Sequence, residues 1–109
     1  MKKSISTARM CRMSKELLDL TLDGWERSIF FDASKLLEEC GEVAECLNKT
    51  SKTSEDLGDE LADVIAVCFV IALKKGIDMD TAILRKQEER VKKLVKRFHG
   101  GTYPVKKEG

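Results

Sequence analysis

Two pairs of acidic residues stand out as groups that could do chemistry. Glu39 and Glu42 form one pair, and Glu60 and Asp63 form the other, each at i, i+3 spacing. On a helix, residues three apart project from the same face. Two antiparallel helices could therefore bring four carboxylates around one small volume, where unpaired anions are costly. Mg²⁺ takes oxygen ligands and removes that cost, so the spacing predicts a metal site between two helices.

The neighbours of these acids place them at the edge of a core. Glu42 lies beside Val43, and Asp63 directly precedes the unbroken apolar run Val64–Leu73. Gly41 lies inside the same helical pattern, where glycine costs about 1 kcal/mol relative to alanine. It fits a point at which another helix or a ligand comes close. A single E-x-x-E is common on solvated helices, but two pairs beside an apolar run are a stronger signal.

Four helices are needed to position these acids. Apolar spacing and helix-ending glycines predict helices over residues 7–22, 26–48 and 54–75, a fourth from 78 or 80 to 98, and an irregular tail over 100–109. We expect residues 1–99 to form a single all-α domain. The helix over 26–48 carries two apolar stripes, which predicts cover from two sides. The run at 64–73 predicts burial all round, partly in a dimer interface.

Composition excludes several classes of protein. Charged residues make up 36% of the chain and apolar residues 42%, which argues against both a disordered and a membrane protein. Acids concentrate at 38–63 and bases at 85–107, so the chain does not resemble a uniformly basic nucleic-acid binder. The cysteines form no CxxC pair and the one histidine is distant, which disfavours zinc. The polar start predicts no secretory signal, so we expect a cytoplasmic protein.

The acids also belong to longer motifs. The pattern Glu38-Glu39-x-x-Glu42 followed by Glu60-x-x-Asp63 resembles the signature of the all-α nucleotide pyrophosphohydrolases, the MazG-like, dCTPase and dimeric dUTPase superfamily. The segment from Lys35 to residue 45 is similar to the family's "K-x-x-E-E-x-G-E" helix. Residues 76–80 are similar to its "G-I-D-L-D" connection. The resemblance covers residues 25–98.

This resemblance implies a fold and a reaction. Members have a four-helix subunit that forms a helical bundle with a second subunit, as a homodimer or a dimer of dimers. They hydrolyse a nucleoside triphosphate at the α–β phosphate bond to the monophosphate and pyrophosphate. Carried onto this chain, the resemblance assigns Mg²⁺, or Mn²⁺ in its place, to Glu39, Glu42, Glu60 and Asp63. Glu38 or Glu39 would orient or deprotonate the attacking water.

Substrate contacts have both a functional and an ordinary interpretation. Lys35 could contact phosphate or simply pair with Glu38 or Glu39. Trp25 could stack on the base or cap the core. On the basic fourth helix, three residues recur at helical spacing and could bind the β- and γ-phosphates, although surface solvation explains much of this run: Lys86, Arg90 and Lys93.

Base recognition departs from the dCTPase pattern. The aromatic residues that those proteins place after E-x-x-D are replaced here by Val67 and Cys68. Tyr103 could close over the site if the tail folds back. The base, the sugar, the number of metal ions and the biological role are left open.

Two other functions fit parts of the sequence. Phosphoribosyl-ATP pyrophosphohydrolase has the same fold and carboxylates, but this chain lacks its doubled glutamate after Gly41 and its aromatic-His pair after Asp63. A non-enzymatic helical dimerisation module would explain the run Val64–Leu73. It would not explain carboxylates at the edge of that run.

Overall fold

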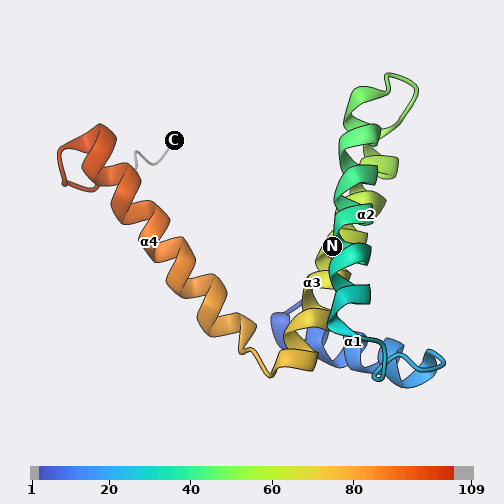
Figure 1. The fold of residues 1–109 in the computed structure, drawn as a ribbon. Coiled ribbons are helices and arrows are strands. Elements are labelled where there is room, and N and C mark those ends of the chain that lie inside the picture. Colours follow the sequence, from blue (N-terminus) through green and yellow to red (C-terminus); the bar gives the residue numbers. More distant parts are fainter. Residues whose placement is uncertain (1–2, 105–109) are drawn as a thin grey trace. The chain divides into compact units, whose positions relative to one another are not determined.

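The structure is a computed structural model that describes residues 3–104 (Figure 1). Those residues form four helices and no strand, which confirms the all-α prediction. The helices are α1 (Thr7–Leu20), α2 (Ile29–Asn48), α3 (Ser54–Lys75) and α4 (Met79–His99). The chain divides into two units, one up to Ile77 and one from Asp78, and each is described by itself. Within 3–104, no helix is long and apolar enough to cross a bilayer.

Side-chain caps set where α2 and α3 begin. The Ser28 hydroxyl accepts a hydrogen bond from the Phe31 N–H, so α2 starts at Ile29, three residues later than predicted. Thr53 and Asp56 form a reciprocal capping box that starts α3. Ser54, which could also cap a helix by its residue type, is instead the first residue of α3.

Helix ends follow the expected rules, with one early stop. Gly76 adopts a left-handed conformation with φ of 65°, which ends α3. The Thr21 N–H and hydroxyl both donate to the Leu17 carbonyl, and α1 ends at Leu20 rather than at the predicted residue 22. Asp78 caps α4 through the Thr81 N–H.

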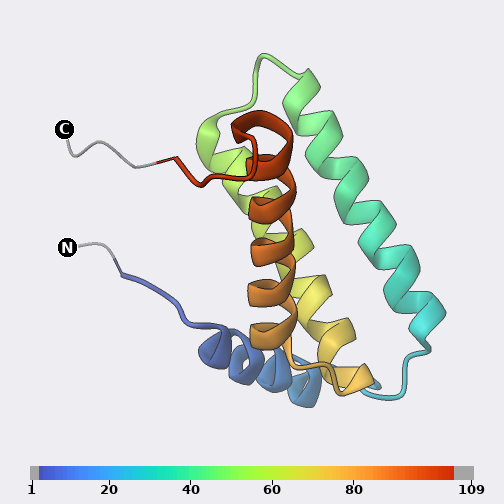
Figure 2. The ribbon, with the colours of Figure 1, turned by 90° about the vertical axis from the view of Figure 1, so that its left-hand side faces the viewer.

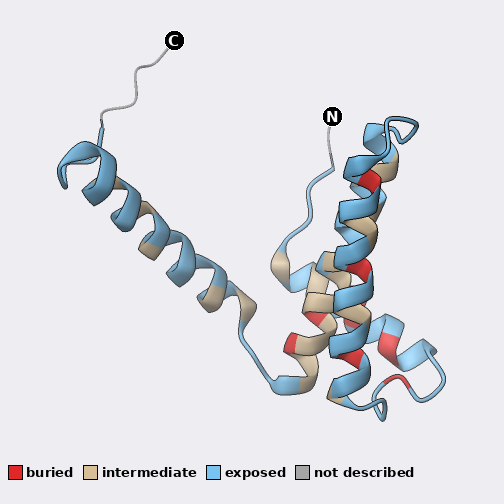
Figure 3. Cartoon of the chain, turned by 45° about the horizontal axis from the view of Figure 1, so that its top comes forward, coloured by how far each residue is buried: buried red, intermediate tan, exposed pale blue. Residues whose placement is uncertain are grey.

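The first unit is built on the antiparallel pair α2 and α3, with α1 lying across one end of it (Figures 1 and 2). Its buried apolar residues come from all three helices and form a thin core: Leu18, Cys46, Phe69 and Ala72 (Figure 3). In the run at 64–73 only Phe69 and Ala72 are buried, and Ile65 is 48% exposed. Within one chain, therefore, the run is only partly covered, and its predicted share in a dimer interface stays a prediction.

Only one of the two apolar stripes on α2 is covered within the first unit. The stripe that faces α3 is buried or half-buried and consists of Ile29, Leu36, Val43 and Cys46. The other stripe is exposed at every position and consists of Phe30, Ala33, Leu37, Cys40, Ala44 and Leu47. We expected both stripes of α2 to be covered. Within the first unit only the stripe that faces α3 is covered.

A buried ion pair fastens the start of α2 to the end of α3. Lys74 Nζ lies 2.8 Å from Asp32 Oδ2, and the two side chains are 10% and 7% exposed. The same ammonium donates to the Arg27 carbonyl at 3.1 Å. One cation therefore holds both the first turn of α2 and the connection that precedes it.

Removing one member of this pair should destabilise the fold. Lys74→Met leaves Asp32 buried without a counter-ion, which should lower the free energy of unfolding by about 3 kcal/mol. The double variant Asp32→Leu with Lys74→Met should recover most of that loss. Urea denaturation measures both, with the exposed neighbour Lys75→Met as control. A Lys74→Met protein as stable as the parent would contradict the role given to the pair.

Candidate functional site

The four predicted carboxylates converge between α2 and α3. Each can place one oxygen so that all four oxygens lie within 4.8 Å of one another: Glu39, Glu42, Glu60 and Asp63. The short connection 49–53 makes the two helices antiparallel, and the i, i+3 spacing turns each pair toward the other helix. Burial is graded from Glu39, which is buried, to Asp63, which is exposed. The cluster is thus closed at its base and open to solvent at one side.

Two oxygens of this cluster are buried without any hydrogen-bond donor among the described residues. They are Glu39 Oε2 and Glu60 Oε2. The other oxygen of Glu39 lies 3.2 Å from Lys35 Nζ. A buried carboxylate oxygen that lacks a donor is costly. A hard divalent cation takes all-oxygen ligand sets of this kind, so the four residues fit Mg²⁺ or a similar ion.

Crowding of like charges changes the acidity of the cluster. A hydrogen bond shared with Glu60 raises the pKa of Glu42 from 4.5 to about 7, and the charge of Glu39 and partial burial add to this rise. In the absence of a cation, the cluster therefore retains a proton near neutral pH.

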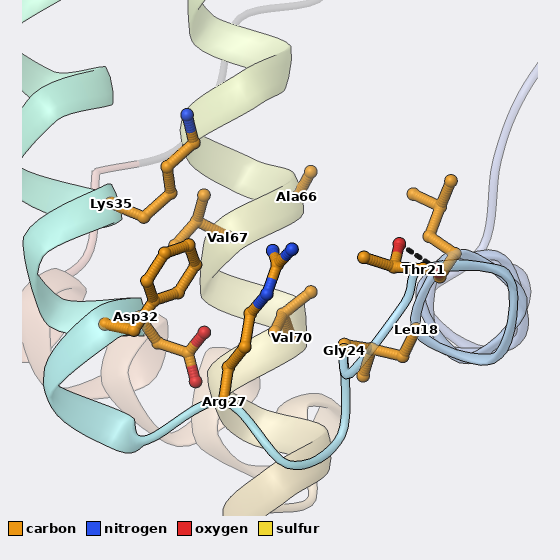
Figure 4. A pocket seen from close by; sticks show the side chains of 11 residues that line it. Leu18, Thr21, Gly24, Arg27, Asp32, Lys35, Ala66, Val67 and Val70 are labelled. Atoms are coloured by element: carbon orange, nitrogen blue, oxygen red, sulfur yellow. Dashed lines mark hydrogen bonds between the residues drawn. The ribbon is translucent and has the colours of Figure 1, made fainter.

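An apolar hollow of about 260 Å³ lies next to the cluster, between α1, the α1–α2 connection, α2 and α3 (Figure 4). It is lined by Leu17, Leu18, Thr21, Gly24, Arg27, Phe31, Asp32, Lys35, Ala66, Val67 and Val70. Lys35 belongs to the hollow and also pairs with Glu39, so the two features adjoin. A Cβ at Gly24 would come within 2.7 Å of the Leu18 carbonyl oxygen, which explains why glycine is needed at this wall.

A second hollow, of about 250 Å³, adjoins the cluster toward the α2–α3 connection. Its lining is mainly charged and includes two members of the cluster: Glu42, Glu45, Cys46, Lys49, Lys52 and Glu60. The carboxylates thus lie between an apolar hollow and a polar one.

Comparison with known protein families gives a match over residues 33–95 to the MazG nucleotide pyrophosphohydrolase domain. This stretch is more than half of the 109 residues and contains all four carboxylates. The chain belongs to the MazG family. No curated protein and no solved structure matches it.

MazG membership supports nucleotide pyrophosphohydrolase activity in general terms, and it confirms the family that the motifs indicated. It also implies a nucleotide substrate. The family match does not assign roles to individual residues, which depend on their contacts in the structure.

Lys35 and Glu38 lie beside the carboxylate cluster of this MazG chain. Lys35 Nζ is 3.5 Å from Glu38 Oε1 and 3.2 Å from Glu39 Oε1, and both carboxylates raise the pKa of Lys35. The simple ion-pair interpretation of Lys35 is therefore present in the structure, while a phosphate contact stays a prediction. Glu38 is more than half exposed, next to a buried ligand candidate.

Trp25 lies in the turn that precedes α2. Its indole N–H donates to Asp19 Oδ1 at 2.7 Å, and this bond is the main cause that lowers the pKa of Asp19. The residues that line the apolar hollow include Arg27 and Val67 but not Trp25. Base stacking by Trp25 stays a prediction.

The basic residues predicted to bind phosphate lie on α4, in the second unit. Within that helix, Lys86 Nζ is 3.3 Å from Glu89 Oε2, and this contact lowers the pKa of Glu89. Phosphate binding by Lys86, Arg90 and Lys93 stays a prediction. Tyr103 lines a hollow of this unit with residues of α4 and the following turn.

Sequence reasoning missed Arg27, Phe31, Lys49 and Lys52 as neighbours of the site. None of them belongs to a motif that indicates chemistry, and each lies in or next to a connection. Gly41, by contrast, was expected to mark a close approach. A Cβ there would meet no described atom within 4 Å.

When a chelator keeps cations away from the protein, the thermal stability of the folded chain should fall as the pH rises through neutrality. The pKa of Glu42 in the folded chain, about 7, lies above its ordinary value of 4.5. The folded chain therefore binds the extra proton, and this stabilisation is complete below 4.5 and lost as the pH rises through about 7. With chelator present, the melting temperature should be lower at about pH 8 than at about pH 6.

Glu42→Gln should remove most of that pH dependence, whereas Glu16→Gln on the exposed face of α1 should leave it unchanged. Carboxylates with a lowered pKa, such as Asp56, titrate below this range. A parent protein whose melting temperature is flat between these pH values would show that the cluster does not hold the proton.

Proposed function

We propose that the chain is a Mg²⁺-dependent nucleoside triphosphate pyrophosphohydrolase that cleaves the α–β phosphate bond and releases the monophosphate and pyrophosphate. One observation carries the proposal: four carboxylates of a MazG chain meet within 4.8 Å, and two of their oxygens are buried without a donor. A solvated acidic face would not bury unpaired oxygens. This cluster therefore favours an enzyme over a simple dimerisation module.

The ion would be held by Glu39, Glu42, Glu60 and Asp63, with Mn²⁺ as a substitute for Mg²⁺. When bound, it would polarise the phosphate and neutralise the charge of the leaving pyrophosphate. The exposed side of the cluster at Asp63 leaves room for the phosphates.

The chain's own residues would prepare the attacking water. Glu38 lies directly before the buried Glu39 and is exposed enough to reach a water molecule. We assign to Glu38 the role of proton acceptor. It would take the proton of the water as the water's oxygen attacks the α-phosphorus and the bond between that phosphorus and the α–β bridging oxygen breaks. Glu39 is the alternative acceptor. Lys35 lies between these two carboxylates and holds both in place.

The two hollows supply places for the rest of the substrate. The apolar hollow suits a nucleoside, because sites for small ligands are mostly apolar with a few polar groups. Lys35 then faces the ribose and the first phosphate. In the second unit, Lys86, Arg90 and Lys93 are kept as candidates for binding phosphate. Trp25 is kept as a candidate for stacking on the base.

Pyrophosphate release from a panel of nucleoside triphosphates tests this function. We expect release that depends on Mg²⁺ and that falls by about 100-fold or more in kcat/KM when Glu60→Gln or Asp63→Asn removes a ligand. Mg²⁺ should also raise the melting temperature of the parent and not of Glu60→Gln, because only the parent would bind the ion.

Glu16→Gln is the matched control, since it removes an exposed carboxylate on α1 far in sequence from the cluster. Absence of hydrolysis across ribo- and deoxyribonucleotides, phosphoribosyl-ATP included, would overturn the enzymatic proposal. A melting temperature insensitive to Mg²⁺ and Mn²⁺ would overturn the metal site.

We further propose that the active form is a homodimer or a dimer of dimers. The exposed stripe on α2 supports this, because Phe30 and Leu37 are 79% and 76% exposed. Leu61 on α3 is 47% exposed. Apolar faces of this extent are uncommon on monomers and mark contact surfaces. A second copy of the chain would cover them by extending the α2–α3 packing.

A charge placed in this stripe should separate the subunits. Leu37→Glu should shift the mass measured by light scattering toward the 12.3 kDa of one chain, because an unpaired carboxylate in an apolar interface is costly. Leu22→Glu, at an equally exposed position outside the stripe, is the control. A parent protein that is monomeric at micromolar concentration would refute the dimer and leave the carboxylate cluster untouched.

A further inference from the structure

Arg27 is held at the apolar hollow from two directions. Its carbonyl accepts the hydrogen bond from buried Lys74 at 3.1 Å, which fixes the backbone. Its guanidinium lies 4.7 Å from the centre of the Phe31 ring, and both residues line the hollow (Figure 4). Figure 4 shows the guanidinium reaching into the space between α3 and the end of α1. An arginine stacked on an aromatic ring is pre-organised to donate hydrogen bonds.

The other polar side chains of this hollow are already engaged. Asp32 Oδ2 is bound by Lys74, and the Thr21 hydroxyl donates to the Leu17 carbonyl at 2.6 Å. Lys35 pairs with two glutamates of α2. No carboxylate in residues 3–104 forms an ion pair with Arg27, whose guanidinium offers only donors. Arg27 is therefore the cation of the hollow whose donors are left for a ligand.

The remaining walls are apolar and leave limited room. Ala66, Val67 and Val70 from α3 face Leu18 from α1 (Figure 4). A volume of about 260 Å³ lies just below the range of about 300–1,000 Å³ that is usual for small-molecule sites. Such a space suits a flat ring with polar groups along one edge. Because Lys35 links the hollow to Glu39, a ring placed here would lie beside the phosphate chemistry.

We infer that Arg27 reads the base of the substrate and gives the enzyme a preference for keto bases. The outer edge of uracil or thymine presents O4, and that of guanine presents O6 and N7, all of which accept hydrogen bonds. Cytosine presents an amino group there, and adenine presents an amino group beside its N7 acceptor, so part of the guanidinium would meet another donor in both bases. This inference rests on the proposed function, and it concerns which triphosphates that function acts on.

Discrimination of this kind comes from mismatch as much as from attraction. In a partly apolar hollow, an amino group opposite Arg27 leaves donors on both sides without acceptors. A site built to hydrogen-bond its ligand rejects analogues that leave its polar groups unpaired. The keto preference should therefore appear as a ratio of kcat/KM values between matched substrates.

Three variants separate base reading from other roles. Arg27→Met keeps the apolar stem over Phe31 but removes the donors. Arg27→Lys keeps the charge but not the planar fork. Arg12→Met, on the exposed face of α1 and outside the hollow, is the matched control. Thermal melting followed by circular dichroism checks that each variant folds. If Arg27→Met does not fold, Arg27→Lys is used in its place to test base reading.

The measurement compares dUTP, dTTP and dGTP with dCTP and dATP. We expect the parent to favour the keto group, and Arg27→Met to lower the keto-to-amino ratio of kcat/KM by about tenfold, with a smaller loss in Arg27→Lys. The control variant should keep the parent ratio. An equal loss on all five substrates would make Arg27 a phosphate contact and overturn the inference, as would a parent without base preference.

Binding of the product nucleotides separates this inference from the proposed hydrolysis. Calorimetry with UMP and CMP needs no turnover. Tighter binding of UMP that is lost in Arg27→Met would support base reading even if no triphosphate is hydrolysed, in which case only the proposed function fails. Hydrolysis together with equal binding of UMP and CMP by the parent would overturn the inference alone.

Discussion

Repulsion among four carboxylates is the constraint on which the rest of this structure depends. Antiparallel packing of α2 and α3 brings their oxygens within 4.8 Å, and two of these oxygens are buried without a donor. Protons relieve the strain in part, as the raised pKa of Glu42 indicates. A divalent cation relieves it more fully, because it supplies charge and coordination to all four groups at once. Under the proposed function, the helix pair would therefore be most stable in the metal-bound state that carries out the reaction.

The scaffold has to tolerate this repulsion with little core of its own. Few apolar residues are fully buried in one chain, and one stripe of α2 is exposed along its whole length. Local interactions at the helix ends supply part of the stability that the small core does not. The capping box at Thr53 starts α3, and Lys74 fastens the opposite end of the pair through Asp32. The cluster lies between these two anchored ends, so its own repulsion does not have to be balanced by contacts at the same place.

Much of this arrangement could be predicted from the sequence, because it depends on local rules. Helical spacing and short connections set four helices, and the i, i+3 acids on neighbouring antiparallel helices had to face one another. Exact starts were less predictable, since Thr53 and Ser54 can each cap a helix. Arg27 and Phe31 could not be found as neighbours of the site, because the hollow they line exists only where α1 crosses the helix pair. The second stripe of α2 was predicted as apolar but not as exposed within one chain, since periodicity shows that a face is apolar and not what covers it.

Under the proposed function, the same charges make substrate and metal depend on each other. A triphosphate alone would be repelled by the cluster, and in the polar hollow the cations Lys49 and Lys52 are accompanied by three glutamates. An ion bound to the carboxylates would cancel part of their negative charge and offer its open coordination positions to the phosphates. The apolar hollow has no such dependence, since its free charge is the cation of Arg27. Nucleoside recognition is therefore built into the fold, whereas phosphate recognition arises only when the cation is bound.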